Sequence, residues 1–196
     1  MKSNVRNYTS KEILTYVKSL KSFKGVPHGY WIAGFQSNEN APNKFDDKFY
    51  LFNHELFIKV LSGTTHAGLP VLQGGFLKYN KKGTAVIKTN EWYYDVWTYG
   101  LHQGRMPALK QVGTFLGYRD GDRDAIPEEI GELEKFNGTG INFHTVSYEL
   151  DIKKIGENIG EWSAGCQVAN NVEQYLMLIN MVKHQKRITY CLVKEF

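Results

Sequence analysis

The chain is poor in cysteine, with only Cys166 and Cys191 among its 196 residues. Neither lies in a Cys-x-x-Cys pair, which excludes a zinc site of the usual cysteine-rich spacing. No acidic metal-binding motif accompanies the six histidines. We therefore expect no metal and no other cofactor. Cys191 lies in a strand-like segment, where alternation of side chains predicts an ordinary core residue.

Long apolar runs are absent as well, so the sequence predicts no membrane span. The first ten residues lack the apolar segment of a signal peptide, and we expect the chain to be made in the cytoplasm. Lysine and arginine total 24 against 20 acidic residues, a net charge of +4, and no basic run stands out. This charge pattern argues against a nucleic-acid partner.

What the chain does contain favours one sheet-rich domain. A hydrophobic content of 42% with 22% charged residues is typical of a globular protein, and 196 residues suffice for one substantial core. The 12 Tyr, 11 Phe and 4 Trp residues, together with 19 Gly, favour strands between glycine-marked turns. No internal repeat or linker interrupts the chain, so we predict a single domain over residues 1–196.

Local patterns place two helices among many strands. Thr9 and Glu12 form the pattern of a capping box, which predicts a helix within an N-terminal helical arm, residues 1–25. Asn170 or Asn171 is the expected cap of a second helix. The segment 119–135 predicts a polar turn followed by an exposed loop or short helix. Strands are expected at 30–35, 48–52, 54–61, 84–88, 92–99, 112–118, 141–146 and 188–193. The predicted fold class is therefore β-dominated α+β.

The most informative segments are 140–144, which ends an apolar run at His144, and 161–166, which ends a Ser-Ala-Gly turn at Cys166. A free cysteine is only a few per cent thiolate at neutral pH, and a neighbouring imidazole can activate it. Cys166 and His144 are therefore a candidate nucleophile and base. The non-catalytic alternatives are a buried structural thiol and a core histidine whose ring nitrogens are hydrogen-bonded.

Three residues beside Cys166 are candidates for supporting roles. Backbone N–H groups at Gly165 and Cys166 can form an oxyanion hole in such a turn. Ser163 either positions the imidazole or only shapes the turn. Packing is the simpler explanation of Trp162, and substrate contact is the alternative.

The order His144, spacer, Ser163-Ala164-Gly165-Cys166 resembles the active-site signature of the YkuD-type L,D-transpeptidases, enzymes that remodel peptidoglycan. The resemblance covers residues 140–168. It implies a mixed β-sandwich with the catalytic cysteine at its rim and a helix after the cysteine turn. It also implies a cysteine that carbapenems acylate. The sequence departs from the family pattern at Ala164, where a histidine is usual, at Val168, where an arginine is common, and at Val146, where a glycine is expected.

A second histidine segment, residues 100–105, follows an aromatic strand and contains His102 and Arg105. It is either a polar strand end or part of the substrate site. Stem peptides of peptidoglycan carry carboxylates, so Arg105 is a candidate for the cation missing at Val168. Arg119 and Arg123 are weaker candidates for the same role.

The resemblance implies a cysteine acyltransferase acting on peptidoglycan stem peptides through a thioester, with an amine or water as acceptor. The alternative is a peptidoglycan hydrolase, such as an L,D-carboxypeptidase or endopeptidase used in phage lysis or infection, with the same Cys/His pair. A third possibility is a non-catalytic wall-binding or virion structural module. The expected site of action is the cell wall or periplasm, reached by lysis or export. The sequence does not indicate an oligomeric state.

Overall fold

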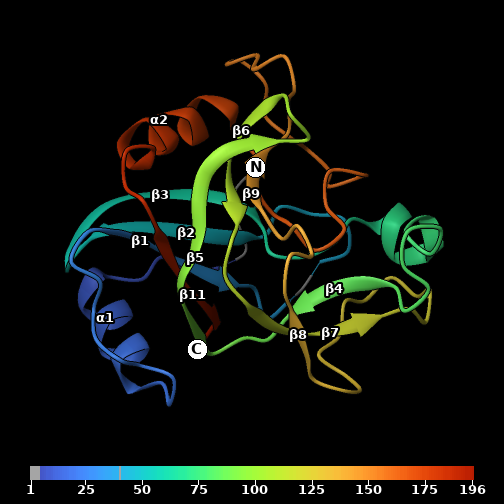
Figure 1. The fold of residues 1–196 in the computed structure, drawn as a ribbon, viewed down its shortest axis with the longest axis horizontal. Coiled ribbons are helices and arrows are strands. Elements are labelled where there is room, and N and C mark those ends of the chain that lie inside the picture. Colours follow the sequence, from blue (N-terminus) through green and yellow to red (C-terminus); the bar gives the residue numbers. More distant parts are fainter. Residues whose placement is uncertain (1–4, 40) are drawn as a thin grey trace.

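The computed structural model describes residues 5–39 and 41–196. Eight strands form a closed barrel and three more form a small separate sheet, which lies at the lower right in Figure 1. Around the barrel the strands run β1 (Tyr30–Gln36), β11 (Ile188–Lys194), β5 (Glu91–His102), β6 (Met106–Gln111), β9 (Phe143–Thr145), β10 (Gln167–Ala169), β3 (Leu56–Thr64) and β2 (Asp47–Asn53). The small sheet has the order β4 (Thr84–Ile87), β7 (Phe115–Asp120) and β8 (Glu134–Phe136).

The prediction of a β-dominated fold is confirmed, whereas the main sheet closes on itself in place of the expected sandwich. Closure depends on β1, which pairs in parallel with β11 and antiparallel with β2. Strands β1 and β11 lie far apart in the sequence, so no local sequence pattern predicts their pairing. Among the described residues, no helix is long and apolar enough to cross a bilayer.

Helix α1 (Ser10–Ser19) begins at the predicted capping box. The Glu12 N–H donates to the Thr9 hydroxyl at 3.2 Å, and the Thr9 N–H donates to the Glu12 carboxylate at 2.7 Å. Ile13 and Val17 are buried on the barrel wall, where the Trp92 indole N–H donates to the Val17 carbonyl at 2.7 Å. The helix predicted from the capping box is thus confirmed at residues 10–19, while residues 1–4 of the predicted arm lie outside the described residues.

Helix α2 (Val172–Val182) follows the cysteine turn, as expected, and Asn171 is its cap. The Gln174 N–H donates to the Asn171 side chain at 2.9 Å. Tyr175 anchors the helix on the barrel because its hydroxyl donates to the Phe143 carbonyl at 2.7 Å, in the strand that also carries His144.

The sequence analysis missed three short strands. β6 contains Pro107, which has no N–H for a ladder and lowers strand propensity, and β10 spans only three residues. The acidic segment predicted as a loop or short helix ends in β8, whose Glu134 pairs with Lys82 and approaches Arg119. Cross-strand ion pairs of this kind are invisible in a one-dimensional pattern.

The barrel brings the sequence motifs together at one end. Strands β9 and β10 are parallel neighbours, with His144 opposite Val168 and Phe143 opposite Gln167. The turn that ends at Cys166 therefore lies beside the strand of His144. On its other side this turn contacts the small sheet, where the Ala85 N–H donates to the Ala164 carbonyl at 3.2 Å. The site thus lies between the barrel and the small sheet.

Candidate active site

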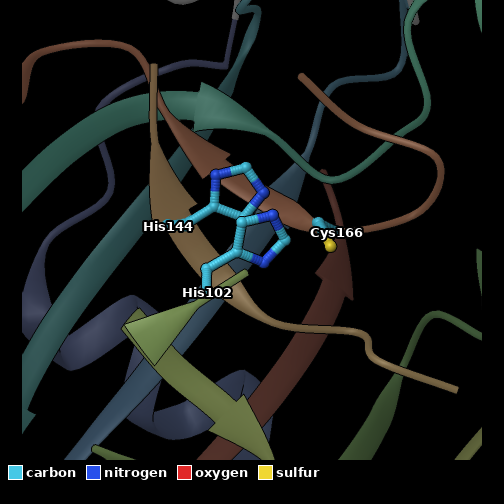
Figure 2. Close-up of side chains that lie close together, drawn as sticks. All are labelled: His102, His144 and Cys166. Carbon is cyan, nitrogen blue, oxygen red and sulfur yellow. The ribbon is translucent and has the colours of Figure 1, made fainter. Parts of the chain in front are cut away.

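His102, His144 and Cys166 converge at this end of the barrel. One nitrogen of each imidazole and the Cys166 sulfur all lie within 4.8 Å of one another. Figure 2 shows the two rings face to face, with centroids 4.2 Å apart and an interplanar angle of 21°, and the Cys166 side chain beside them. His102 comes from the end of β5, so the structure adds to the predicted His144 and Cys166 pair an imidazole that sequence spacing had left unassigned.

His144 has the tautomer that a general base requires. Its Nδ1 lies 2.9 Å from the Thr145 carbonyl oxygen, an acceptor, so Nδ1 carries the proton. Nε2 therefore has a free lone pair, and this buried atom has no hydrogen-bond partner among the described residues. Burial, and then the charge of nearby His102, lowers the pKa of His144 to about 3. The side chain is consequently neutral at physiological pH.

His102 has the opposite tautomer. The Asn142 side-chain oxygen accepts the Gln111 N–H at 2.9 Å, which orients the amide so that its nitrogen donates to His102 Nδ1 at 3.0 Å. A neutral His102 therefore carries its proton on Nε2. Burial, and then Lys110, lowers the pKa of His102, which favours this neutral form. His102 is thus suited to donate a hydrogen bond through Nε2, whereas His144 offers a free hydrogen-bond acceptor at its own Nε2.

Two imidazoles and a thiol are good ligands for zinc, so the cluster is also a candidate metal site. Because the two ring planes are nearly parallel and their centroids lie 4.2 Å apart, an ion in the plane of one imidazole would lie well outside the plane of the other. His102 also has its unprotonated nitrogen occupied by Asn142. The residues therefore do not fit a metal centre without rotation of the His102 ring and loss of that bond.

Cys166 is a protonated thiol at rest. Its sulfur donates to the Gly140 carbonyl at 3.4 Å, and burial raises the pKa of the thiol to about 11 even though the side chain keeps some solvent exposure. A hydrogen bond from the Asn142 backbone N–H opposes this rise only in part. The thiol and His144 form no preorganised ion pair, so deprotonation must accompany attack on a substrate.

The raised pKa predicts how Cys166 will react with a small alkylating reagent. We expect iodoacetamide to modify Cys166 slowly at pH 7, with a rate constant that rises about tenfold per pH unit between pH 7 and 10, because the thiolate fraction rises in that proportion below the pKa. Mass spectrometry of peptides from the quenched protein measures the rate. A plateau beginning below pH 8 would contradict the protonated resting thiol. Cys191 is fully buried and should stay unmodified in the folded chain.

The turn before Cys166 is closed by Ser163. Its hydroxyl accepts the Gly165 N–H at 3.1 Å and donates to the Cys166 carbonyl at 2.8 Å. The structure therefore places Ser163 in the turn and not against the imidazole. The Gly165 N–H, which we expected in an oxyanion hole, is already occupied by that hydroxyl. The Cys166 N–H takes part in no hydrogen bond within residues 5–39 and 41–196 and remains the backbone donor for an oxyanion.

A cleft of about 930 Å³ opens beside the cluster. Cys166, His102 and Trp162 line it, and the Trp162 ring lies 5.2 Å from that of Tyr148. Arg105 is not among the lining residues, and its guanidinium covers the Tyr148 ring at 4.2 Å. Arg119, the weaker sequence candidate, does line the cleft.

Sequence reasoning missed Asn142 and Gln111, which orient His102, and Tyr148 in the cleft wall. Asn142 lies two residues before His144, so its spacing was the one available signal. Gln111 and Tyr148 are ordinary residues of a strand end and a loop, and their roles depend on contacts between distant segments.

Comparisons with known proteins add no assignment. No family model, no curated protein and no solved structure matches this chain.

Proposed function

We propose that the protein is a cysteine acyltransferase in which His144 deprotonates Cys166 as the sulfur attacks an amide carbonyl. The observation that carries this proposal is His144 Nε2, which is buried without a hydrogen-bond partner among the described residues, in an imidazole that has a ring nitrogen within 4.8 Å of the Cys166 sulfur. An unpaired buried acceptor costs about 1–3 kcal/mol of stability. Accepting the thiol proton would give this atom a partner.

The reaction follows from the positions of these groups. As the thiol proton passes to His144 Nε2, the sulfur bonds to the amide carbonyl carbon, and the Cys166 N–H stabilises the oxyanion. The carbon–nitrogen bond then breaks, and protonated His144 gives its proton to the leaving amine. A thioester remains on Cys166. An amine acceptor that attacks it gives a new amide, and water gives a carboxylic acid.

The substrate class in this proposal comes from the resemblance to L,D-transpeptidases, which implies stem peptides of peptidoglycan. The cleft is compatible with a short peptide because it has aromatic walls at Trp162, Tyr148 and Phe76, together with charged groups. The hydrolase alternative uses the same steps up to the thioester, and it differs only in the acceptor.

One observation favours the non-catalytic module as a second candidate. The thiol has its pKa raised to about 11 and donates to Gly140, so it forms no hydrogen bond with either imidazole at rest. Catalytic hydrogen bonds often tighten only when substrate is bound. A test must therefore supply a reactive acyl group.

The test is intact-mass spectrometry after incubation with a carbapenem. We expect an adduct of one carbapenem per chain on the parent protein, none on Cys166→Ala, and a full adduct on Cys191→Ala. Addition of a chelator should leave the adduct unchanged, since the proposed step uses no metal. Absence of the adduct, with a thermal unfolding transition like that of Cys166→Ala, would reject the acyltransferase and favour the non-catalytic module.

A further inference from the structure

The turn that carries the thiol offers an oxyanion fewer backbone donors than its sequence suggests. The Gly165 N–H already donates to the Ser163 hydroxyl at 3.1 Å, which leaves the Cys166 N–H as the free donor of this turn within the described residues. Oxyanion holes combine backbone N–H groups with side-chain donors such as Asn, Gln or His. A second donor can therefore come from a side chain that shares the cleft with Cys166.

The two stacked imidazoles differ in their access to that cleft. His102 lines the cleft together with Cys166, whereas His144 is not among the lining residues and its side chain is only 1% exposed. Figure 2 shows the His102 ring stacked on that of His144 and directed toward Cys166. A substrate carbonyl that approaches the sulfur from the cleft therefore meets His102, while His144 stays covered.

The surrounding hydrogen bonds fix the proton of His102 on Nε2. The Gln111 N–H donates to the side-chain oxygen of Asn142 at 2.9 Å, so the amide nitrogen of Asn142 faces His102 Nδ1 at 3.0 Å and donates to it. A neutral imidazole carries one proton, which must then be on Nε2. Within the described part of the chain this Nε2–H has no hydrogen-bond acceptor. It is thus a donor held in position and unused.

The charge state of His102 suits a hydrogen-bond donor. Burial, and then Lys110, lowers the pKa of His102, so the ring is neutral at physiological pH. A neutral imidazole with a lowered pKa is a known means of polarising a carbonyl group. Because the ring is neutral, its Nε2–H stays in place when a negative charge develops nearby, and His144 remains the group that takes the thiol proton.

His102 is also close enough to the reacting atoms. One of its ring nitrogens lies within 4.8 Å of the Cys166 sulfur. After attack, the oxyanion is bonded to the same carbon as the sulfur, so it lies only two bonds from the sulfur. A donor stabilises an oxyanion from about 2.7–3.1 Å. An oxyanion formed on the His102 side of the sulfur is therefore within reach of this ring.

We propose that the Nε2–H of His102 is the second donor of the oxyanion hole, alongside the N–H of Cys166. This inference rests on the proposed function, because it takes Cys166 as the nucleophile. As the sulfur bonds to the carbonyl carbon, the π electrons of the carbonyl move to the oxygen, which accepts both hydrogen bonds, and the thiol proton passes to His144. When the carbon–nitrogen bond breaks, the leaving amine takes that proton, and His102 keeps its own. His102 is then a catalytic residue, and Asn142 is a positioning residue.

The experiment compares two reactions of the same thiol. Acylation by a carbapenem passes through an oxyanion, whereas alkylation by iodoacetamide displaces iodide in one step and forms none. For His102→Leu, we expect the ratio of the acylation rate constant to the alkylation rate constant to fall about 10²–10³-fold at neutral pH. His102→Gln keeps an N–H donor, so its ratio should stay at least about tenfold above that of His102→Leu. Intact-mass time courses measure both rates.

A structural measurement and a matched control complete the test. NMR of isotopically labelled histidine should show the His102 proton on Nε2. His184→Leu replaces an exposed histidine in the loop after α2 and should leave both rates unchanged. A proton on His102 Nδ1, or an unchanged rate ratio in a folded His102→Leu protein, would overturn this proposal alone. Equal losses of acylation and alkylation would do the same and assign His102 a structural role. A parent protein that forms no adduct would overturn the acyltransferase together with this inference.

Discussion

Replacement of His144 by glutamine is expected to lower the rate of Cys166 acylation by about 10²–10⁴-fold, the usual contribution of a positioned general base. Glutamine occupies a similar volume but cannot take a proton from the thiol. The rate is measured as the time course of carbapenem adduct formation by intact mass. Iodoacetamide labelling at pH 10 should change little, since hydroxide replaces the base there, and this confirms that the thiol remains accessible.

The matched control is His102→Gln. His102 accepts a hydrogen bond from Asn142 at Nδ1, so its neutral form can only donate through Nε2. Glutamine can also donate, and the acylation rate should fall less than in His144→Gln. A larger loss in His102→Gln would reverse the assignment and make the half-buried imidazole the base.

Substitution of Gly165 by alanine should disrupt the site without touching the cysteine. Gly165 has φ +124°, a conformation open essentially only to glycine, and an added Cβ would lie 2.5 Å from the Ala85 carbonyl oxygen. We expect a loss of about 2–3 kcal/mol in unfolding free energy. A shift of the Cys166 backbone by about 1 Å should also cost about 10²-fold in acylation. Denaturant unfolding and adduct kinetics measure the two effects.

Gly138→Ala separates backbone strain from collision. Gly138 has φ +63°, and no atom lies within 4 Å of its ideal Cβ position. This substitution should cost about 1 kcal/mol of stability and leave acylation unchanged. A Gly165→Ala protein as stable and as reactive as Gly138→Ala would show that the contact with Ala85 does not position the nucleophile.

The sequence predicts those parts of the fold that depend on neighbours along the chain. Thr9 and Glu12 lie three residues apart and satisfy one another, so the start of α1 is readable as a local pattern. The aromatic alternation of β5 is similarly local. Closure of the barrel is not a local feature, because it depends on hydrogen bonds between β1 and β11, segments more than 150 residues apart.

The same difference between local and distant contacts explains which residues of the site could be predicted from the sequence. His144 and Cys166 could be predicted from the sequence because both fall in one motif, residues 140–168. The parallel pairing of β9 and β10 then brings the two segments together. His102 precedes His144 by 42 residues, and its role depends on an amide oriented by Gln111. The preference for Arg105 over Arg119 followed proximity in sequence to His102. Arg119, and not Arg105, is among the residues that line the cleft.

The hydrogen bond between Ala85 and Ala164 also gives a partner to a backbone group at the edge of the small sheet. β4 is one of the two edge strands of the small sheet, and the unpaired backbone of an edge strand is a template for pairing with another chain. The turn before Cys166 covers this edge at Ala85. The backbone of the turn is therefore constrained in a second way, because displacement of the turn would leave the Ala85 N–H at the edge of the sheet without this partner. This role at the edge of β4 does not depend on the chemical state of the thiol, because the hydrogen bond uses the backbone of Ala164 and not the side chain of Cys166.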